Sequence, residues 1–172
     1  TEFSGSYGQG FVYNGKNFLF EGGLLVATSP TKVSDALRAE GDGRNADFSV
    51  QDNTSMKIYY NKDQITKEIG ITSITDKSAL NSNNVNISQY TYADSNNSFD
   101  DFVIFKYKIS SVDNSFLSDL YAGLFFDWDL NDDATDYAGF DSERLMGYVT
   151  NFQNNPNELI GVMILSDNYG ES

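Results

Sequence analysis

The chain has 172 residues, 40% of them hydrophobic and 15% aromatic, which is enough apolar mass for one packed domain. Its net charge of −14 makes nucleic acid and anionic membrane surfaces unfavourable partners and divalent cations favourable ones. Cysteine and histidine are both absent, which excludes disulfides, thiolate or imidazole metal sites, and histidine-dependent catalysis.

The N-terminal part begins with strand signals. The Asn14-Gly15 pair, flanked by apolar residues, predicts a hairpin over residues 10–20. A second apolar run at 24–29 predicts a buried strand that ends at Pro30. The glycine pair Gly22-Gly23 is expected to break the chain between the hairpin and this strand.

One short helix is expected next, over residues 31–40, with Thr31 or Ser34 as its N-cap and Gly41 as its stop. It spans about two turns, so it would be a satellite of the β-structure. The loop that follows is rich in Gly, Asp and Asn and is a second candidate for a cation site. Its oxygen-bearing residues are Glu40, Asp42, Asn45 and Asp47.

The rest of the chain is a series of short β-branched or aromatic runs bounded by polar turn residues. The expected strands fall within residues 47–52, 55–61, 69–79, 84–94, 100–110, 117–130, 144–151 and 158–167, with 151–157 as a hairpin loop. In the run at 100–110, alternation places Tyr107 and Ile109 on an apolar face and Lys106 and Lys108 on the other.

About ten short strands with at most one short helix predict an antiparallel all-β sandwich. No linker stands out, so residues 1–172 are expected to form one sandwich-like domain. The chain has no initiator methionine and no signal-peptide pattern, so we expect an excised piece of a larger protein. No apolar run approaches the length of a membrane helix, and membrane insertion is not expected.

An acidic stretch follows the apolar run at 120–126. Its oxygen-bearing residues recur at intervals of two, so their side chains point to one side of an extended segment. Calcium binds six to eight oxygens, and the stretch lacks the glycine and glutamate of an EF-hand. A calcium site in a loop of a β-protein is therefore predicted; the alternative is a solvated acidic turn. The predicted ligands are Asp127, Asp129, Asn131, Asp133, Asp136 and Asp141.

Aromatic residues suggest an alternative function. Trp128 shares a strand face with Leu124 and Phe126, so it is predicted to anchor the core. Paired carboxylates are uninformative in a chain with 25 acidic residues, and no catalytic motif is present, so an enzyme is not expected. Exposed tyrosines would suit a carbohydrate-binding module. The candidates are Tyr59, Tyr60, Tyr90 and Tyr92.

Five strings occur in the order "FVYNGKNFLFEGGLLVATSPTKVSDALR", "DDFVIFKYKIS", "LYAGLFFDWDL", "AGFD" and "LMGYV". In order and pattern they resemble the accessory β-rich regions that follow subtilisin-like (S8) peptidase domains in large secreted bacterial proteins. The resemblance implies a non-catalytic module of an exported or cell-surface protein. We expect this module to have a structural or adhesive role and to contact neighbouring domains of its parent protein. The expected function is thus a calcium-stabilised accessory domain, with polysaccharide binding as the alternative.

Overall fold

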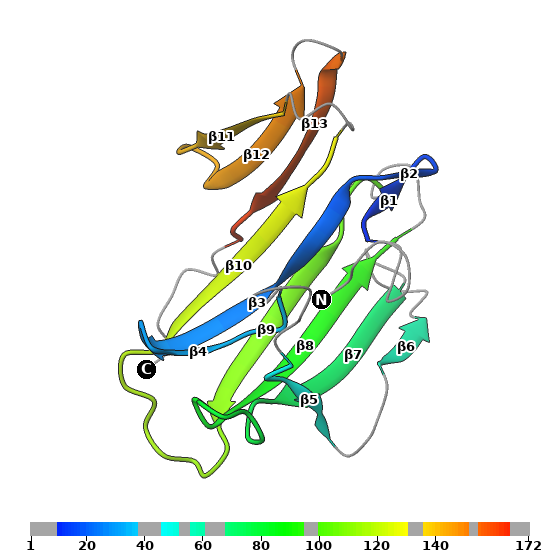
Figure 1. Ribbon diagram of the computed structural model, residues 1–172. Helices are drawn as coiled ribbons and strands as arrows, with labels where there is room; N and C mark the ends of the chain where they lie inside the picture. The colour runs from blue at the N-terminus through cyan, green and yellow to red at the C-terminus, as the bar shows by residue number, and fades with distance from the viewer. Residues whose placement is uncertain are drawn as a thin grey trace. The chain divides into compact units, whose positions relative to one another are not determined.

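The computed structural model describes residues 10–37, 46–51, 56–60, 68–94, 100–130, 136–151 and 155–165. These ranges contain thirteen strands and no helix, and the strands form four sheets with antiparallel registers (Figure 1). The prediction of an antiparallel all-β fold is therefore confirmed. Within the same ranges, no helix long and apolar enough to cross a membrane is found.

The chain divides into two compact units. The larger unit contains Gly23–Phe125, and the smaller unit combines Glu2–Gly22 with Phe126–Ser172. The chain passes from one unit to the other within β3 (Leu19–Ser29) and again within β10 (Tyr121–Trp128), which are neighbours in one sheet. The division describes compactness and not independent folding, so the single domain expected from the sequence stays a prediction.

The hairpin predicted at Asn14-Gly15 is confirmed. It joins β1 (Val12–Tyr13) to β2 (Lys16–Asn17), which pair in antiparallel register. The backbone angle φ is 49° at Asn14 and 79° at Gly15, and a two-residue type I′ turn requires positive values at both positions. Asparagine and glycine tolerate this conformation best, which explains why the dipeptide is a reliable signal.

Two expectations about the next segment are wrong. β3 continues through Gly22 and Gly23 without a break, because neither glycine adopts a positive φ. The expected helix is replaced by β4 (Lys32–Ser34), which pairs with β3 and includes the proposed cap Ser34. Pairing with a long strand outweighs the weak propensity of a two-turn helix. The end of that expected helix, from residue 38 to its stop, lies outside the described residues.

The larger unit is built on a five-stranded sheet. The strand order is β5 (Ser49–Val50), β7 (Glu68–Thr75), β8 (Val85–Ala93) and β9 (Ile104–Ser111), and β6 (Lys57–Tyr60) also pairs with β7 (Figure 1). Each of these strands overlaps a run that was predicted to be extended. β9 forms one edge of the sheet within the described part of the chain.

One face of this sheet forms the core of the larger unit. Val85 and Ile87 of β8 are fully buried and cluster with Val26 of β3. Tyr107 and Ile109 of β9 join them, as the alternation in that strand predicted, and burial raises the pKa of the Tyr107 hydroxyl. The other partly buried members are Leu24, Phe48, Ile74, Leu117 and Leu120. Two β-layers therefore pack face to face in this unit, as in a sandwich.

A fully buried carboxylate closes the connection from β7 to β8. Asp76 Oδ2 accepts hydrogen bonds from the Ser34 hydroxyl at 2.7 Å and the Asn83 backbone N–H at 2.6 Å. Asp76 Oδ1 accepts from the Ser82 hydroxyl at 3.0 Å and the Val85 backbone N–H at 2.8 Å. Four donors offset the desolvation of this charge and tie the connection to β4.

The smaller unit contains a three-stranded sheet of β11 (Tyr137–Asp141), β12 (Met146–Asn151) and β13 (Asn155–Met163). β12 and β13 were predicted, although β13 begins inside the expected hairpin loop. β11 was not predicted, because its residues were assigned to the acidic loop. A hydrogen-bonded register of five residue pairs with β12 stabilises β11 despite its short, glycine-containing sequence.

Tyr148 of β12 lies opposite a glycine on each neighbouring strand. Its partners in register are Gly139 of β11 and Gly161 of β13. A Cβ atom placed on Gly139 would lie 2.4 Å from Cζ of Tyr148, so the tyrosine ring covers the glycine backbone. Gly147, the residue before Tyr148, has open space where its Cβ would be. Packing of an aromatic ring over a cross-strand glycine compensates for the missing side chain.

Candidate functional site

The acidic segment that was predicted to bind calcium leaves the end of β10. Asp127 is the penultimate residue of β10, and Asp129 follows the last one. The backbone N–H of Asp129 donates a hydrogen bond to the carbonyl of Phe18 at 2.9 Å, which fixes the start of the segment within the smaller unit. The other two central ligands, Asn131 and Asp133, lie outside the described residues.

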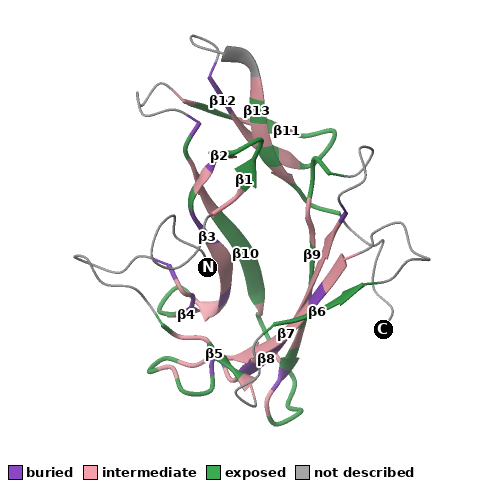
Figure 2. Ribbon diagram, turned by 90° about the vertical axis from the view of Figure 1, so that its right-hand side faces the viewer, coloured by how far each residue is buried: buried purple, intermediate pink, exposed green. Residues whose placement is uncertain are grey.

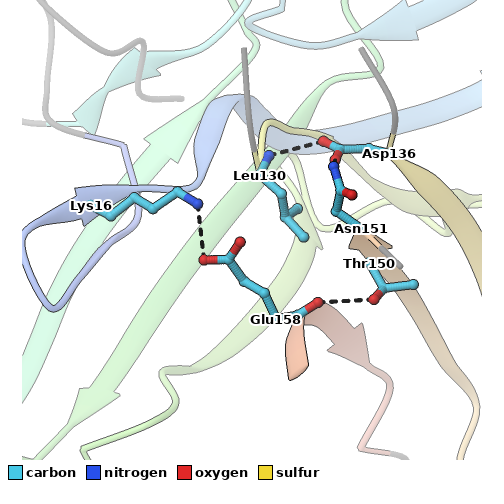
Figure 3. Close-up of polar contacts among 6 residues, drawn as sticks. All are labelled: Lys16, Leu130, Asp136, Thr150, Asn151 and Glu158. Carbon is cyan, nitrogen blue, oxygen red and sulfur yellow. Dashed lines mark hydrogen bonds and ion pairs between the residues drawn. The ribbon is translucent and has the colours of Figure 1, made fainter. Parts of the chain in front are cut away.

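Asp136 joins the two ends of this segment (Figure 3). Its Oδ2 accepts a hydrogen bond from the backbone N–H of Leu130 at 2.9 Å, and its Oδ1 accepts one from the side-chain amide of Asn151 at 3.1 Å. Leu130 and Asn151 are both fully buried. Each carboxylate oxygen therefore already has a protein donor and retains one acceptor position. Asp136 closes the loop, a structural role that the sequence pattern did not indicate.

Asp141 is not brought together with Asp136. It is the last residue of β11, five positions further along an extended strand, which corresponds to a separation of about 16 Å between the two backbones. The Arg144 guanidinium lies 2.5 Å from Oδ2 of Asp141. This hydrogen bond lowers the pKa of the Asp141 carboxyl. Asp141 therefore belongs to the turn between β11 and β12.

The remaining acidic candidates do not form a metal cluster within the described residues, where no group of three or more acidic side chains is placed to hold an ion. Of the second candidate loop, only Asp47 is described; Glu40, Asp42 and Asn45 lie outside. Asp47 accepts a hydrogen bond from the backbone N–H of Asp35 at 3.1 Å. Its carboxylate thus anchors the end of that loop.

Trp128 packs against two phenylalanine rings of the smaller unit. Its ring stacks on Phe126, with centroids 5.0 Å apart and planes 2° from parallel. Phe11 meets it edge-on at 6.0 Å and 84°. Trp128 and Phe126 share a face of β10, as the alternation predicted, and Trp128 is half-buried. Its face is therefore occupied by protein rings, which supports the interpretation of Trp128 as an anchor.

The outer face of the five-stranded sheet carries a second group of candidates. Paired residues on adjacent strands point to the same side, so the register determines which side chains share a face. The core residues Ile74, Ile87 and Ile109 are paired with one another, and the side chains that alternate with them point outward. The outward side chains that concern us are Lys57, Tyr59, Tyr90, Tyr92, Lys106 and Lys108. We call these six residues the tyrosine–lysine face.

Two neighbouring rows across the strands contain most of this face. In one row Tyr90 is paired directly with Lys106 on β9 and is aligned, through the intervening strand β7, with Lys57 on β6. In the other row Tyr92 is aligned with Tyr59. Strand spacing puts the Tyr59 and Tyr92 backbones about 10 Å apart, and Tyr90 and Tyr92 about 7 Å apart. The three rings are therefore distributed over one continuous patch of the sheet.

The tyrosine–lysine face is open to solvent in its outer strands. β6 is exposed throughout (Figure 2), and Tyr59 is 50% exposed. The half-buried Tyr90 has the Lys108 ammonium 5.6 Å from its ring centroid. Tyr60 is 73% exposed but points to the other side of the sheet, so it is separated from the other candidate tyrosines.

The charge of this face differs from that of the whole chain. All three lysines are exposed, and none of them forms an ion pair within the part of the chain that the structure describes. The outward positions of the five described strands contain no Asp or Glu; the rest are Ile, Ser, Thr and Asn. The local formal charge is thus +3, from three Lys and no acidic residue, on a chain with a net charge of −14.

Sequence reasoning named the tyrosines but missed the lysines. Alternation alone places Lys57 with Tyr59 on β6, and Lys106 with Lys108 on β9. It does not reveal that β6 and β9 lie on opposite sides of β8 in one sheet, because strand order and register depend on tertiary pairing. The sequence of each strand therefore indicates which of its side chains share a face, but it does not indicate which strands are neighbours.

The resemblance to accessory regions after S8 peptidases stays a prediction. The strings on which it depends correspond to described strands: the first spans β1 to β4, and the others fall in β9, β10, β11 and β12. Their order is thus the order of consecutive elements in an all-β chain. No protein-family model, no curated protein and no solved structure matches this chain.

Proposed function

We propose that this chain is a non-catalytic accessory module of a secreted or cell-surface bacterial protein, and that the tyrosine–lysine face binds polysaccharide. The observation that carries the proposal is the location of Tyr59, Tyr90 and Tyr92 on one outward face of the larger unit. The proposal also rests on the resemblance to accessory regions of secreted proteins. Neighbouring domains of the parent protein would be its other partners.

Tyrosine suits polysaccharide because its two ends have different chemistry. The ring presents a rigid apolar surface on which the C–H groups of a sugar can pack, and the phenol oxygen donates and accepts hydrogen bonds. Other outward residues of the same sheet, such as Ser73, Ser88 and Asn86, add hydrogen-bonding groups for sugar hydroxyls. A pleated sheet spaces these groups regularly, which matches a repeating linear ligand.

The proposal is tested by affinity electrophoresis in gels that contain soluble polysaccharides. Tyr59→Ala and Tyr92→Ala are expected to reduce retardation of the protein. Tyr60→Ala is the matched control, because Tyr60 is the neighbour of Tyr59 in β6 and is more exposed, yet points to the opposite side. Equal retardation of all three variants would contradict the proposal, as would the absence of retardation by any polysaccharide.

Calcium binding by the acidic segment is a separate proposal for the same accessory role. Its central ligands would be Asp127, Asp129, Asn131 and Asp133. The support is that Asp127 and Asp129 enter the segment from a strand end and that Asp136 closes it, so that a short loop starts and ends at one place. An ion there would offset the repulsion between clustered carboxylates.

A further inference from the structure

The three lysines narrow the ligand class, and this step rests on the proposed function. We infer that the tyrosine–lysine face selects an anionic polysaccharide, one that carries carboxylate or sulfate ester groups. A neutral polysaccharide needs hydroxyl and C–H partners only. Three exposed ammonium groups beside the tyrosines add sites for oxyanions, and no carboxylate opposes them at the outward positions of the described strands.

The positions of the lysines suit a chain-like ligand. Lys57 and Lys106 lie at opposite ends of the row that contains Tyr90, three strand spacings or about 14 Å apart. Lys108 lies in the next row along β9 and contacts the Tyr90 ring. Charges on both sides of an aromatic patch are placed to contact a charged polymer that crosses the strands.

Protection of a sheet edge is a simpler explanation for two of the lysines. Charged side chains on an edge strand oppose pairing with other chains, and Lys106 and Lys108 lie on the edge strand β9. That role requires charge, but it does not require both lysines to point outward with the tyrosines, nor the absence of Asp and Glu from the outward positions of the strands that the structure describes. In a chain with 25 acidic and 11 basic residues, exclusion of acid from one face favours an anionic ligand.

Because the chain is strongly negative, its binding to an anionic polysaccharide should depend on the salt concentration. At low ionic strength the net charge of −14 repels any polyanion. At about 0.15 M salt the Debye length is about 8 Å, so the lysines next to the ligand act while distant carboxylates are screened. At about 1 M salt the lysine contacts are screened as well. Binding should therefore weaken between about 0.15 M and about 1 M salt.

The experiment uses the full chain and two pairs of matched polymers. Dextran sulfate is compared with dextran, and polygalacturonate with its methyl ester, so that each pair differs only in its anionic groups. We expect the anionic member of at least one pair to bind at least about tenfold more tightly in about 0.15 M salt. The pair that discriminates then shows whether sulfate or carboxylate is recognised.

Charge-removal variants complete the test. Lys57→Gln, Lys106→Gln and Lys108→Gln combined should abolish the preference for the anionic polymer. Lys32→Gln with Lys77→Gln is the control, because both lysines are exposed and lie outside the tyrosine–lysine face. Equal binding within each pair, unchanged in the triple variant, would overturn the inference and leave the proposed function standing. No binding to any polymer would overturn both.

Two other outcomes would also overturn the inference. Tighter binding to a single-stranded oligonucleotide than to either anionic polysaccharide would identify a nucleic-acid face, for which aromatic and basic side chains are also used. Self-association that the triple lysine variant abolishes, measured by sedimentation equilibrium, would show that the face binds the acidic surface of a second copy.

Discussion

Replacing Asp76 with asparagine tests whether its buried hydrogen-bond network stabilises the larger unit. Each carboxylate oxygen accepts one serine hydroxyl and one backbone N–H. Asparagine has a single acceptor oxygen, so its NH₂ group must face one pair of these donors. The hydroxyl can rotate away, but the backbone N–H of Asn83 or Val85 cannot, and it is left without an acceptor in a buried place.

The cost of this change follows from the number of bonds lost. A hydrogen bond to a charged group contributes roughly 1.5–3 kcal/mol, and an unsatisfied buried donor costs roughly 1–3 kcal/mol. We therefore expect Asp76→Asn to lower the free energy of unfolding by roughly 2–4 kcal/mol. Asp119→Asn is the control; it removes an exposed carboxylate and should change the free energy by less than about 0.5 kcal/mol.

Urea unfolding followed by two signals gives the measurement. Far-UV circular dichroism reports strands in both units, whereas the single tryptophan, Trp128, reports the smaller unit. A single domain predicts that both signals shift equally in the Asp76→Asn variant, although Asp76 lies in the larger unit. An Asp76→Asn midpoint equal to that of the wild type would refute the reasoning about the buried carboxylate. A shift in circular dichroism alone would refute the single domain.

Three further outcomes are expected. Gly161→Ala should destabilise by roughly 1–3 kcal/mol because its Cβ would lie 2.6 Å from the backbone carbonyl oxygen of Gly147; Gly147→Ala, whose Cβ would meet open space, should stabilise by up to about 1 kcal/mol, and equal midpoints of the two variants in chemical denaturation would contradict this difference. Millimolar calcium should raise Tm by roughly 5 °C or more relative to chelator if it reaches about 100 times Kd; an unchanged Tm would contradict the calcium site. Serine and backbone hydrogen bonds lower the pKa of Asp113 from 3.8 to about 2. Because the folded pKa is below the unfolded one, this stabilisation is present above about pH 4 and lost toward pH 2, and an NMR titration midpoint near 4 would contradict it.

The elements that local sequence determines were predicted well. The Asn14-Gly15 turn is encoded by two residues that tolerate positive φ, and the alternation in β9 correctly separates Tyr107 and Ile109 from the lysines. The helix predicted around Ser34 was wrong because pairing with β3 is a tertiary effect that a two-turn window does not contain. Local patterns therefore predict single strands and turns, whereas the type of a weak element depends on the strand with which it pairs.

The candidate sites show the same limit. Asp136 and Asp141 were predicted to add oxygens to the residues spaced at intervals of two. A strand that the acidic composition concealed carries Asp141 away, and Asp136 closes a loop. Alternation within one strand already separates Tyr60 from Tyr59. Only the register of β6, β7 and β8 shows that Tyr59, and not Tyr60, shares a face with the other candidate tyrosines. Cross-strand neighbours are distant in sequence, so no local window reveals them.

The two places where the chain passes between the units impose an order on biosynthesis. Residues 23–125 form one uninterrupted segment inside the sequence of the smaller unit, whose own parts are 2–22 and 126–172. During synthesis the β1–β2 hairpin precedes the other described strands, but the backbone hydrogen bond from Asp129 to Phe18 must wait until more than a hundred later residues are made. The segment of the larger unit has been synthesised by then, so pairing of β3 with β10 shortens the effective loop between the two parts of the smaller unit and lowers the entropic cost of closing it.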